Sequence, residues 1–482
     1  MKILKIELKD FRCFKTFDIS FSANYNTHVI IAENMVGKSA LMSALRLAAN
    51  TYTSGLKSEW QLQIKDHRIM GKNPISDISP EVSIISTASI TTANSKQLES
   101  KWKKYKTKPK GEKTKVEILS GPDPRKESKN LNKLVAEGKA VQPLFSFIGT
   151  EYIHVESSDT VEWQIDGKSI DGYKGCFEDK SIKKFLFKWL SRIEGILNEI
   201  SRKPIIAETY SDLPENAMFV FKEAVTSILP DITVIDWSAD MKQPIVKLKN
   251  GEIRPFDVLS DGYRYLILLA GELATRAFIL NKHLGKEVLK KINGLVIIDE
   301  FGIHLHPTLQ NDTLIQLQNT FPNVQFIVST HSPLLLNGLK KEQVHILSND
   351  SAGQRIATNP DEDIIGLGAN EILTKIFGLS TTMDNEFIKM NEEYTLLFKK
   401  KSENINLNAS EIEKFQYLSK KLSHLRLDPT LQITTEDPIT TLVKEELANR
   451  NVKKSFVKNL KSTENLKKEV DYIINNLFTN KK

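Results

Sequence analysis

The stretch Gly294-Leu295-Val296-Ile297-Ile298-Asp299-Glu300 decides how the chain folds. Its aliphatic part is typical of a strand that is buried on both faces in a parallel sheet. The two carboxylates follow at the C-terminal end of that strand, where open α/β sheets bind ligands. Because an unpaired buried charge costs several kcal/mol, a bound Mg²⁺ would offset the cost of acids there. We expect Asp299 to hold the ion and Glu300 to activate water against a phosphate, the alternative being acids that simply reach solvent.

A phosphate-binding loop is predicted between the apolar residues 29–31 and a helix-forming segment that starts at Ala40. The loop reads Ala32-Glu33-Asn34-Met35-Val36-Gly37-Lys38-Ser39, and the order strand, loop, helix is the setting that a P-loop needs. Free N–H groups at the helix start attract phosphates, Lys38 reaches the β and γ oxygens, and Ser39 ligates Mg²⁺. Asn34, Gly37 and Ala40 complete the predicted ATP-binding set. Since Ala32 replaces the first glycine of the pattern, the loop indicates ATP binding more than hydrolysis.

Two further motifs could also contact a phosphate. Ser260 and Gly262 open a long apolar helix, and a Ser-x-Gly at a helix start offers a hydroxyl and free N–H groups to an anion. This second cap cannot easily serve the same nucleotide within one subunit, but it would fit a nucleotide held between two copies. His331 ends another apolar strand in the same βαβ series, so we expect it to contact a γ-phosphate or water. His304 and His306 alternate like metal ligands, yet a structural role is favoured because no third ligand cluster is visible.

The composition narrows the class of protein. With 482 residues, 40% of them apolar and 26% charged, the chain has the size for two to four globular domains. Two cysteines cannot form a disulfide framework, and no apolar run approaches the roughly 18 residues of a membrane span. These features predict a cytoplasmic protein that does not enter a membrane.

The order of elements predicts an α/β nucleotide-binding domain split between residues 1–60 and 140–360, with a helical subdomain at about 178–230. A basic insertion, 61–139, separates the two parts. Within it, residues 96–139 hold fourteen Lys and Arg against six Asp and Glu, with Trp102 and Tyr105 among the lysines. This run could bind nucleic acid, or be a solvated hairpin or linker. The helical region 361–482 is expected to bind a partner or to self-associate.

Together these residues resemble the ABC-type ATPases of the SMC/RecF/OLD group. Residues 32–39 look like Walker A, 297–300 like Walker B with its catalytic glutamate, and 259–263 like the Leu-Ser-Gly-Gly-Gln signature, with Asp261 and Tyr263 as departures. Residues 305–307 stand where the D-loop is found, and 329–332 resemble the switch-histidine motif. The Q-loop is not placed, since Gln142 is a poor candidate. The resemblance implies an α/β P-loop domain with a mixed sheet and an ATP-sandwich homodimer, or a higher homo-oligomer.

Within that group, Leu-Ser-Asp-Gly-Tyr-Arg at 259–264 and Ile-Asp-Glu-Phe-Gly-Ile-His-Leu-His-Pro at 298–307 look like bacterial anti-phage ATPases of the Septu (PtuA) type. That resemblance implies a separate HNH nuclease as partner, and no Toprim-like acidic pattern follows residue 333. The predicted function is an ATPase that dimerises around ATP and controls a nuclease effector in anti-phage defence. Two alternatives are a RecF-like repair ATPase that binds DNA through residues 96–139, and a nucleotide-binding scaffold with little hydrolysis.

Overall fold

The computed structural model describes residues 1–33, 35–56, 62–70, 78–92, 96–110, 112–150, 152, 163–165, 167–203, 212–402 and 407–426. The chain divides into two compact units, Met1–Gly378 and Leu379–Lys482. Strands and helices alternate along much of the first unit, as the α/β prediction requires. The predicted domain boundaries stay a prediction.

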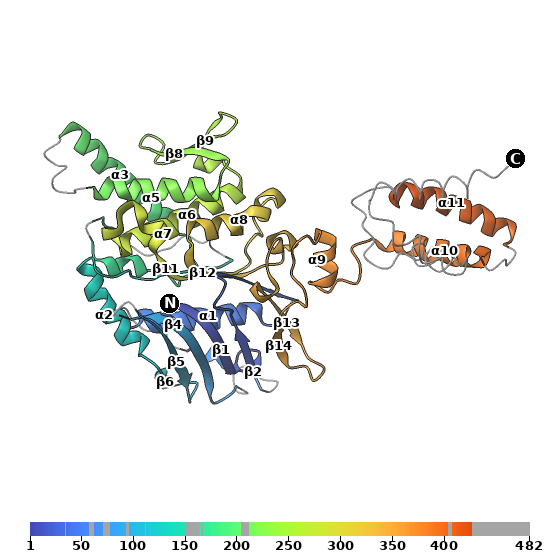
Figure 1. Ribbon diagram of the computed structural model, residues 1–482, viewed down its shortest axis with the longest axis horizontal. Coiled ribbons are helices and arrows are strands. Elements are labelled where there is room, and N and C mark those ends of the chain that lie inside the picture. Colours follow the sequence, from blue (N-terminus) through green and yellow to red (C-terminus); the bar gives the residue numbers. More distant parts are fainter. Residues whose placement is uncertain are drawn as a thin grey trace, which may run out of the picture. The chain divides into compact units, whose positions relative to one another are not determined.

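A six-stranded sheet forms the centre of the first unit (Figure 1). Its order is β14 (Arg355–Thr358), β13 (Val344–Asn349), β3 (Thr27–Ala32), β12 (Asn323–Ser329), β11 (Asn293–Ile298) and β7 (Leu144–Ile148). All neighbours pair in parallel except β14, which is antiparallel to β13. The strand predicted at 294–298 lies in this sheet with every residue from Gly294 to Ile298 buried, which explains its unbroken aliphatic sequence.

Helices cover both faces of this sheet. On one face lies α1 (Lys38–Thr53), whose contacts with β1, β4 and β11 place it between the central sheet and a second one. On the other face α6 (Asp261–Leu280) packs against β7 and against α5 (Leu213–Ile228). Nearly all of α6 is buried, as its continuous apolar sequence indicates. The described residues of this unit also form α2 (Pro124–Ala136), α3 (Lys183–Arg202), α7 (Val288–Lys291), α8 (Pro307–Thr320) and α9 (Ala369–Lys375).

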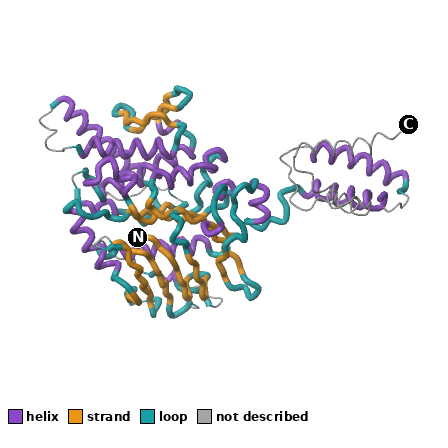
Figure 2. The backbone as a smooth tube through the Cα atoms, viewed as in Figure 1, coloured by secondary structure: helices purple, strands orange, loops and turns teal. Residues whose placement is uncertain are grey.

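The second sheet is antiparallel and is shown below the first in Figure 2. Its order is β2 (Phe14–Ser20), β1 (Lys2–Phe11), β4 (Val82–Thr91), β5 (Gln97–Lys106) and β6 (Lys115–Ser120). The lysine-rich part of the predicted insertion is therefore paired into a sheet with the first strands of the chain. Trp102 is fully buried, so the structure contradicts the idea that this ring stacks on exposed bases.

The alternation of β5 sorts its cations onto two faces. Lys104 is completely buried and donates to Asn50 Oδ1 of α1 at 3.4 Å. Lys101 and Lys103 lie on the outer face, where they pair with Glu7 at 2.9 Å and Glu81 at 3.3 Å. A run of basic residues in the sequence is thus divided between a buried and an ion-paired set.

A three-stranded antiparallel sheet follows α5, in the order β10 (Ile253–Pro255), β9 (Gln243–Leu248) and β8 (Ile232–Ser238). Phe256, just after β10, packs edge-on against Phe187 of α3 at 5.1 Å between ring centroids. This contact fixes the segment that leads into α6, where the predicted Ser260 motif begins. The last described helix of the basic segment, α2 (Pro124–Ala136), packs on α1 through its apolar face.

The second unit contains two helices in its described residues, α10 (Asn385–Ser402) and α11 (Ala409–Arg426). Phe387, Leu397, Leu418 and Leu422 form the buried core between them. The helices predicted for residues 361–482 are therefore present up to residue 426, and the part beyond it lies outside the described residues.

Two buried histidines lie on neighbouring strands of the central sheet. His28 on β3 and His345 on β13 approach to 3.3 Å between Nδ1 and Nε2, and Phe21 packs edge-on against both rings. Burial lowers the pKa of His28 to about 4 and that of His345 to about 3. Both rings are therefore neutral in the folded protein at neutral pH, whereas in the unfolded chain they titrate near 6.5.

We expect acid to weaken this part of the fold. Because the folded pKa values lie below the unfolded one, the stabilisation is complete above about pH 6.5 and falls as the pH drops towards 4 and 3. At pH 5.5 each histidine should cost about 1.4 kcal/mol of unfolding free energy relative to pH 7.5 or higher. Urea unfolding of wild type and His345→Gln at the two pH values measures this, and the difference between the two pH values should be about 1.4 kcal/mol smaller in the variant.

Phe21→Leu is the matched control, because it loosens the same cluster without removing a titrating group. It should lower stability equally at both pH values. A pH dependence that His345→Gln leaves unchanged would show that the buried pair does not titrate as argued.

Candidate nucleotide-binding site

The parallel strands bring the predicted motifs to one edge of the central sheet. Asp299 follows β11 and its N–H donates to Ile148 O, the last residue of β7, at 2.8 Å. Thr330, which follows β12, donates to Ile30 O of β3 at 3.2 Å. The segments after β3, β7, β11 and β12 therefore start side by side, as expected for the carboxyl ends of parallel strands.

The phosphate-binding loop leads from β3 into α1 through Gly37. This residue has φ 121°, and a Cβ at its position would lie 2.6 Å from Cys13 Sγ and 2.8 Å from Phe14 Cζ. Ala32, by contrast, is the last residue of β3 and pairs with Leu347, so its extended backbone does not need glycine. Met35 takes the left-handed conformation with φ 69° and is 94% exposed. The departure at Ala32 therefore leaves the loop intact, and Asn34 lies outside the described residues.

Lys38 starts α1 and points into the site. It is only 8% exposed, and its Nζ hydrogen-bonds with His331 Nε2. Burial lowers the pKa of Lys38, while the charges of Glu300 and Asp299 raise it. Burial, and then the charge of Lys38, lowers the pKa of His331. A neutral His331 can accept this hydrogen bond, and the structure thus brings together four residues that lie up to 293 positions apart in the sequence.

One hydroxyl bonds to both acidic residues, to the side chain of Asp299 and to the backbone of Glu300. Ser329 Oγ donates to Asp299 Oδ1 and accepts from the Glu300 N–H at 2.8 Å. Burial raises the pKa of Asp299, and the Ser329 hydrogen bond and the charge of Lys38 oppose that rise. Glu300 has φ 54°, a left-handed conformation that costs a non-glycine residue about 1–2 kcal/mol. The hydrogen bond to its N–H helps to hold this conformation, which turns the Glu300 side chain away from the strand direction.

The donor set fits Mg²⁺ with ATP. Ser39 and Ala40 follow Lys38 in the first turn of α1, where backbone N–H groups have no partner within the helix, and no acidic residue occupies that turn. A hydroxyl and a carboxylate, here Ser39 and Asp299, are oxygen ligands of the kind that Mg²⁺ takes alongside phosphates and water. The buried ammonium of Lys38, at the start of α1, suits the negative charge of a triphosphate.

The predicted second cap lies at the start of α6. Ser260 is its N-cap, is exposed, and makes no side-chain cap bond to its own helix. Gly262 is buried against the loop after Glu300, since a Cβ there would come within 2.9 Å of His304 O. The start of α6 and the loop after Glu300 therefore pack against each other within one subunit, while Ser260 stays exposed.

Sequence reasoning missed the contribution of the segment after β7. Gly149, Thr150 and Tyr152 line a small recess together with Asp299, Glu300 and Tyr265. Gln142 instead lies at the opposite end of β7, fully buried, and exchanges hydrogen bonds with Asn281. The structure thus excludes Gln142 from the site. No local signal marked Gly149, because only the pairing of β7 with β11 places it there.

A second hollow of about 320 Å³ opens on the other side of Glu300 and is lined by residues 300–303, Gln310, His331 and Ser332. Gln310 holds its wall, since its amide donates to Gly302 O at 2.8 Å and to Leu305 O at 2.9 Å. His306 caps α8 by accepting from the Thr308 N–H, which is a structural role. Among the described residues no cluster of three or more His, Cys, Asp or Glu could bind a metal ion by itself.

Comparison with known proteins agrees with this geometry. The family described as "AAA domain" matches residues 5–215, and the family described as "AAA domain, putative AbiEii toxin, Type IV TA system" matches residues 164–337. The Septu protein PtuA of Bacillus mycoides is 28% identical over 51% of this chain and 33% of its own length. These matches support an ABC/SMC-like ATPase that is similar to PtuA. The predicted resemblance to the anti-phage ATPases of this type is therefore confirmed.

Two further comparisons extend over more of the chain. The Retron Vc95 probable ATPase of Vibrio cholerae is 24% identical over 87% of this chain and 86% of its own length. The SMC head domain from Thermotoga maritima is 14% identical over 74% of this chain and 99% of that structure, with a TM-score of 0.41. In the described part of the chain, no helix has the length and apolar character to cross a bilayer.

Gly37→Ala tests the geometry of the loop. The substitution should lower the free energy of unfolding by about 1–3 kcal/mol, because it adds strain at φ 121° and a clash with Cys13 and Phe14. Urea unfolding measures the cost, and a fluorescent ATP analogue measures the expected loss of nucleotide binding. Gly353→Ala is the control, since Gly353 also has a positive φ (74°) but open space around it. Equal costs for the two variants would contradict the packing argument.

Proposed function

We propose that two copies of this ATPase close around ATP, hydrolyse it, and thereby control a separate nuclease. The observation that carries the proposal is the exposed N-terminus of α6, where Ser260 makes no cap bond to its own helix. Free N–H groups and a hydroxyl at a helix start form an anion site, and the phosphates of a second copy would supply the anion.

Exposed apolar side chains support the same closure. Met35 in the phosphate-binding loop is 94% exposed, Ile303 after Glu300 is 68% exposed, and Val258 before Ser260 is 62% exposed. Each lies within five residues of a predicted nucleotide contact. Large apolar side chains gain free energy when they leave water, and a second copy placed against these three loops would bury them together.

The residues at the sheet edge have complementary tasks in hydrolysis. Lys38 and the start of α1 bind the phosphates, and Glu300 takes the proton from the attacking water. His331 contacts the γ-phosphate in place of its present bond to Lys38. Ser39 and Asp299 would hold Mg²⁺, which when bound neutralises charge on the phosphates. The Ser329 hydroxyl holds the Asp299 carboxylate and the backbone of Glu300 in position.

Glu300→Gln tests the catalytic half and the dimer half in one protein. Phosphate release should fall at least about 100-fold, because the general base is lost while the contacts of the backbone stay. Light scattering with Mg²⁺ and ATP should then show a stable dimer, since bound ATP is no longer consumed. Adding Ser260→Arg to this variant should prevent the dimer by placing bulk and charge at the α6 start.

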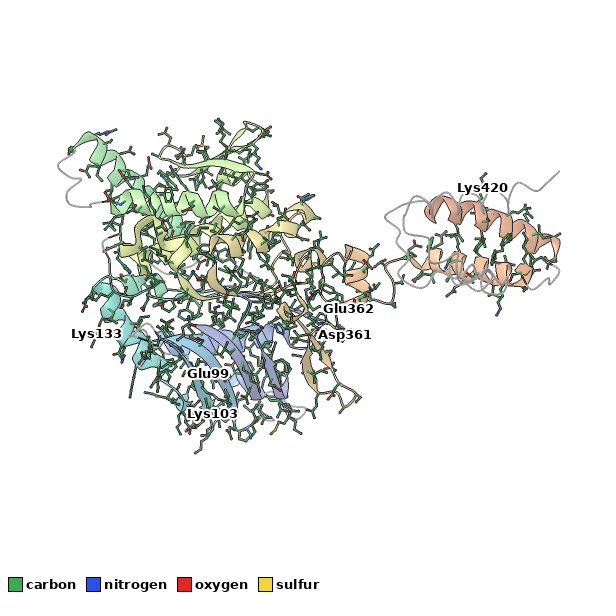
Figure 3. All side chains as sticks on the ribbon, viewed as in Figure 1. Glu99, Lys103, Lys133, Asp361, Glu362 and Lys420 are labelled. Atoms are coloured by element: carbon green, nitrogen blue, oxygen red, sulfur yellow. The ribbon has the colours of Figure 1, made fainter. Side chains whose placement is uncertain are left out.

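Glu362→Gln is the matched control, because Glu362 is an exposed carboxylate outside the site (Figure 3). It should hydrolyse ATP like wild type. Wild-type turnover in Glu300→Gln would remove Glu300 as the base. Absence of an ATP-dependent dimer would overturn the sandwich, and a wild type that binds ATP without releasing phosphate would favour the scaffold alternative.

The proposed control of a nuclease rests on the similarity to the relatives described above. Similarity to Septu PtuA supports a nuclease partner of the HNH type and a role in anti-phage defence, in the cytoplasm, where the two free cysteines Cys13 and Cys176 would stay reduced. Residues 361–482 are the proposed partner-binding or oligomerisation region. A small nuclease that co-purifies with the chain supports this function, whereas a chain that binds DNA by itself favours the second candidate.

That second candidate is a DNA-binding ATPase of the RecF kind, and one surface favours it. Lys126, Lys129 and Lys133 form an exposed stripe along α2, opposite its buried Leu131 and Val135. Lys133 projects from the outer side of the helix in Figure 3. Among the described residues these three lysines pair with no carboxylate, unlike Lys101 and Lys103 of β5. Unpaired lysines at helical spacing can each meet a phosphate.

A triple Lys→Gln variant at 126, 129 and 133 tests this candidate. If α2 binds duplex DNA, the slope of log K against log salt should fall by about 2–3, because each lost phosphate contact removes about 0.9. Fluorescence anisotropy with a labelled duplex at several salt concentrations measures it. The paired lysines give the control, since Lys101→Gln with Lys103→Gln should keep the wild-type slope. No salt-dependent binding by wild type would dismiss the candidate.

A further inference from the structure

A buried polar cluster lies behind the recess beside Glu300. Tyr152, which lines that recess and is 1% exposed, donates from its hydroxyl to Glu272 Oε2 at 2.8 Å. Glu272 lies in the middle of α6 and also accepts from Arg276 Nε at 2.7 Å and from Ser146 Oγ at 2.9 Å. Both members of the Glu272–Arg276 pair are almost completely buried. Such a pair adds little net stability, so its value lies in holding one geometry.

Arg276 anchors the cluster on its far side. Its NH1 donates to Gly172 O at 2.8 Å and to Lys174 O at 2.7 Å, and its guanidinium lies 5.1 Å from the Trp163 ring centroid. With Glu272 on one side and two carbonyls on the other, this arginine has little freedom to move. The carboxylate of Glu272 is therefore a fixed acceptor, and Tyr152 is the member of the cluster that reaches the recess.

Ring contacts continue from Tyr152 to the loop after Glu300. Tyr152 packs edge-on against Tyr265 at 6.0 Å between centroids, and Tyr265 lies 6.1 Å from Phe301 and 6.2 Å from His304. Tyr265 belongs to the second turn of α6, close to Ser260. Three segments thus meet around the Tyr152 ring: the segment after β7, the loop after Glu300, and α6. The hydroxyl of Tyr152 bonds to Glu272, which lies 12 residues after Ser260.

We propose that Tyr152 is a positioning residue that couples two sites of one subunit. One is the candidate nucleotide-binding site beside Glu300, and the other is the N-terminus of α6, which would contact the ATP bound by the second subunit. This inference rests on the proposed ATP-sandwich dimer. An α-helix is stiff, so a displacement of α6 at Glu272 moves its N-terminus, about 18 Å away along the axis, by a comparable amount. The bond from Tyr152 to Glu272 joins the residues that line the recess beside Glu300 to this helix. Tyr152 itself touches neither reacting atoms nor phosphate in this arrangement.

Tyr152→Phe in the Glu300→Gln protein tests the inference, because it removes the hydroxyl and keeps the ring packing. Binding of a fluorescent ATP analogue at low protein concentration, where the chain is monomeric, should stay within about twofold. The ATP concentration for half-maximal dimerisation, followed by light scattering, should rise about 5- to 10-fold, a change typical of coupling between sites. A purely structural loss would weaken both quantities together.

Tyr173→Phe is the matched control. Tyr173 is also a buried tyrosine, and its hydroxyl donates to Pro143 O at 2.6 Å, but that bond lies at the opposite end of β7. It should cost similar stability and leave dimerisation unchanged. If Tyr152→Phe dimerises like Tyr173→Phe, the inference fails; if the Glu300→Gln parent itself does not dimerise with ATP, the proposed function fails with it. Should Tyr152→Phe not fold, Tyr152→Leu also lacks the hydroxyl and is measured against Tyr173→Leu.

Discussion

The candidate site depends on a buried ammonium, that of Lys38, which faces two carboxylates at the carboxyl ends of parallel strands. Lys38 is nearly enclosed, and only the charges of Asp299 and Glu300 oppose the effect of that burial on its pKa. Such an arrangement stabilises little in itself, because desolvation consumes most of the Coulomb attraction. It persists because the six-stranded sheet fixes the ends of β3, β11 and β12 beside one another. The fold thus supplies the rigidity, and the charges at its edge supply the affinity for phosphate.

Around that edge the chain uses hydrogen bonds that span long stretches of sequence. Ser329 joins the end of β12 to both acids after β11, and Thr330 Oγ donates to Phe301 O at 2.7 Å. The same loop packs on Gly262 of α6. A displacement at the carboxylates therefore reaches the start of α6 through direct contacts, and the cluster at Glu272 gives that helix a second fixed point.

Much of this could be predicted because the motifs are local. Buried runs such as 294–298, the Gly-Lys-Ser at a helix start and the apolar α6 segment carry their structure in a few adjacent residues. Features that arise from pairing between distant strands were not accessible. Gly149 and Tyr152 enter the site only through the register of β7 with β11, and Lys104 is buried although it stands in a run of basic residues. The substitution at Ala32 suggested a weakened loop, yet its backbone is extended.

The left-handed conformation of Glu300 also limits how this family of sites can change over evolutionary time. Glycine, asparagine and aspartate adopt positive φ at low cost, whereas β-branched residues such as valine and isoleucine do so rarely. A lineage that gives up hydrolysis while it keeps ATP as a structural ligand would therefore drift at this position towards the first group. The positive φ at position 300, and not only the loss of the carboxylate, would therefore limit which substitutions an inactive homologue can carry and still fold.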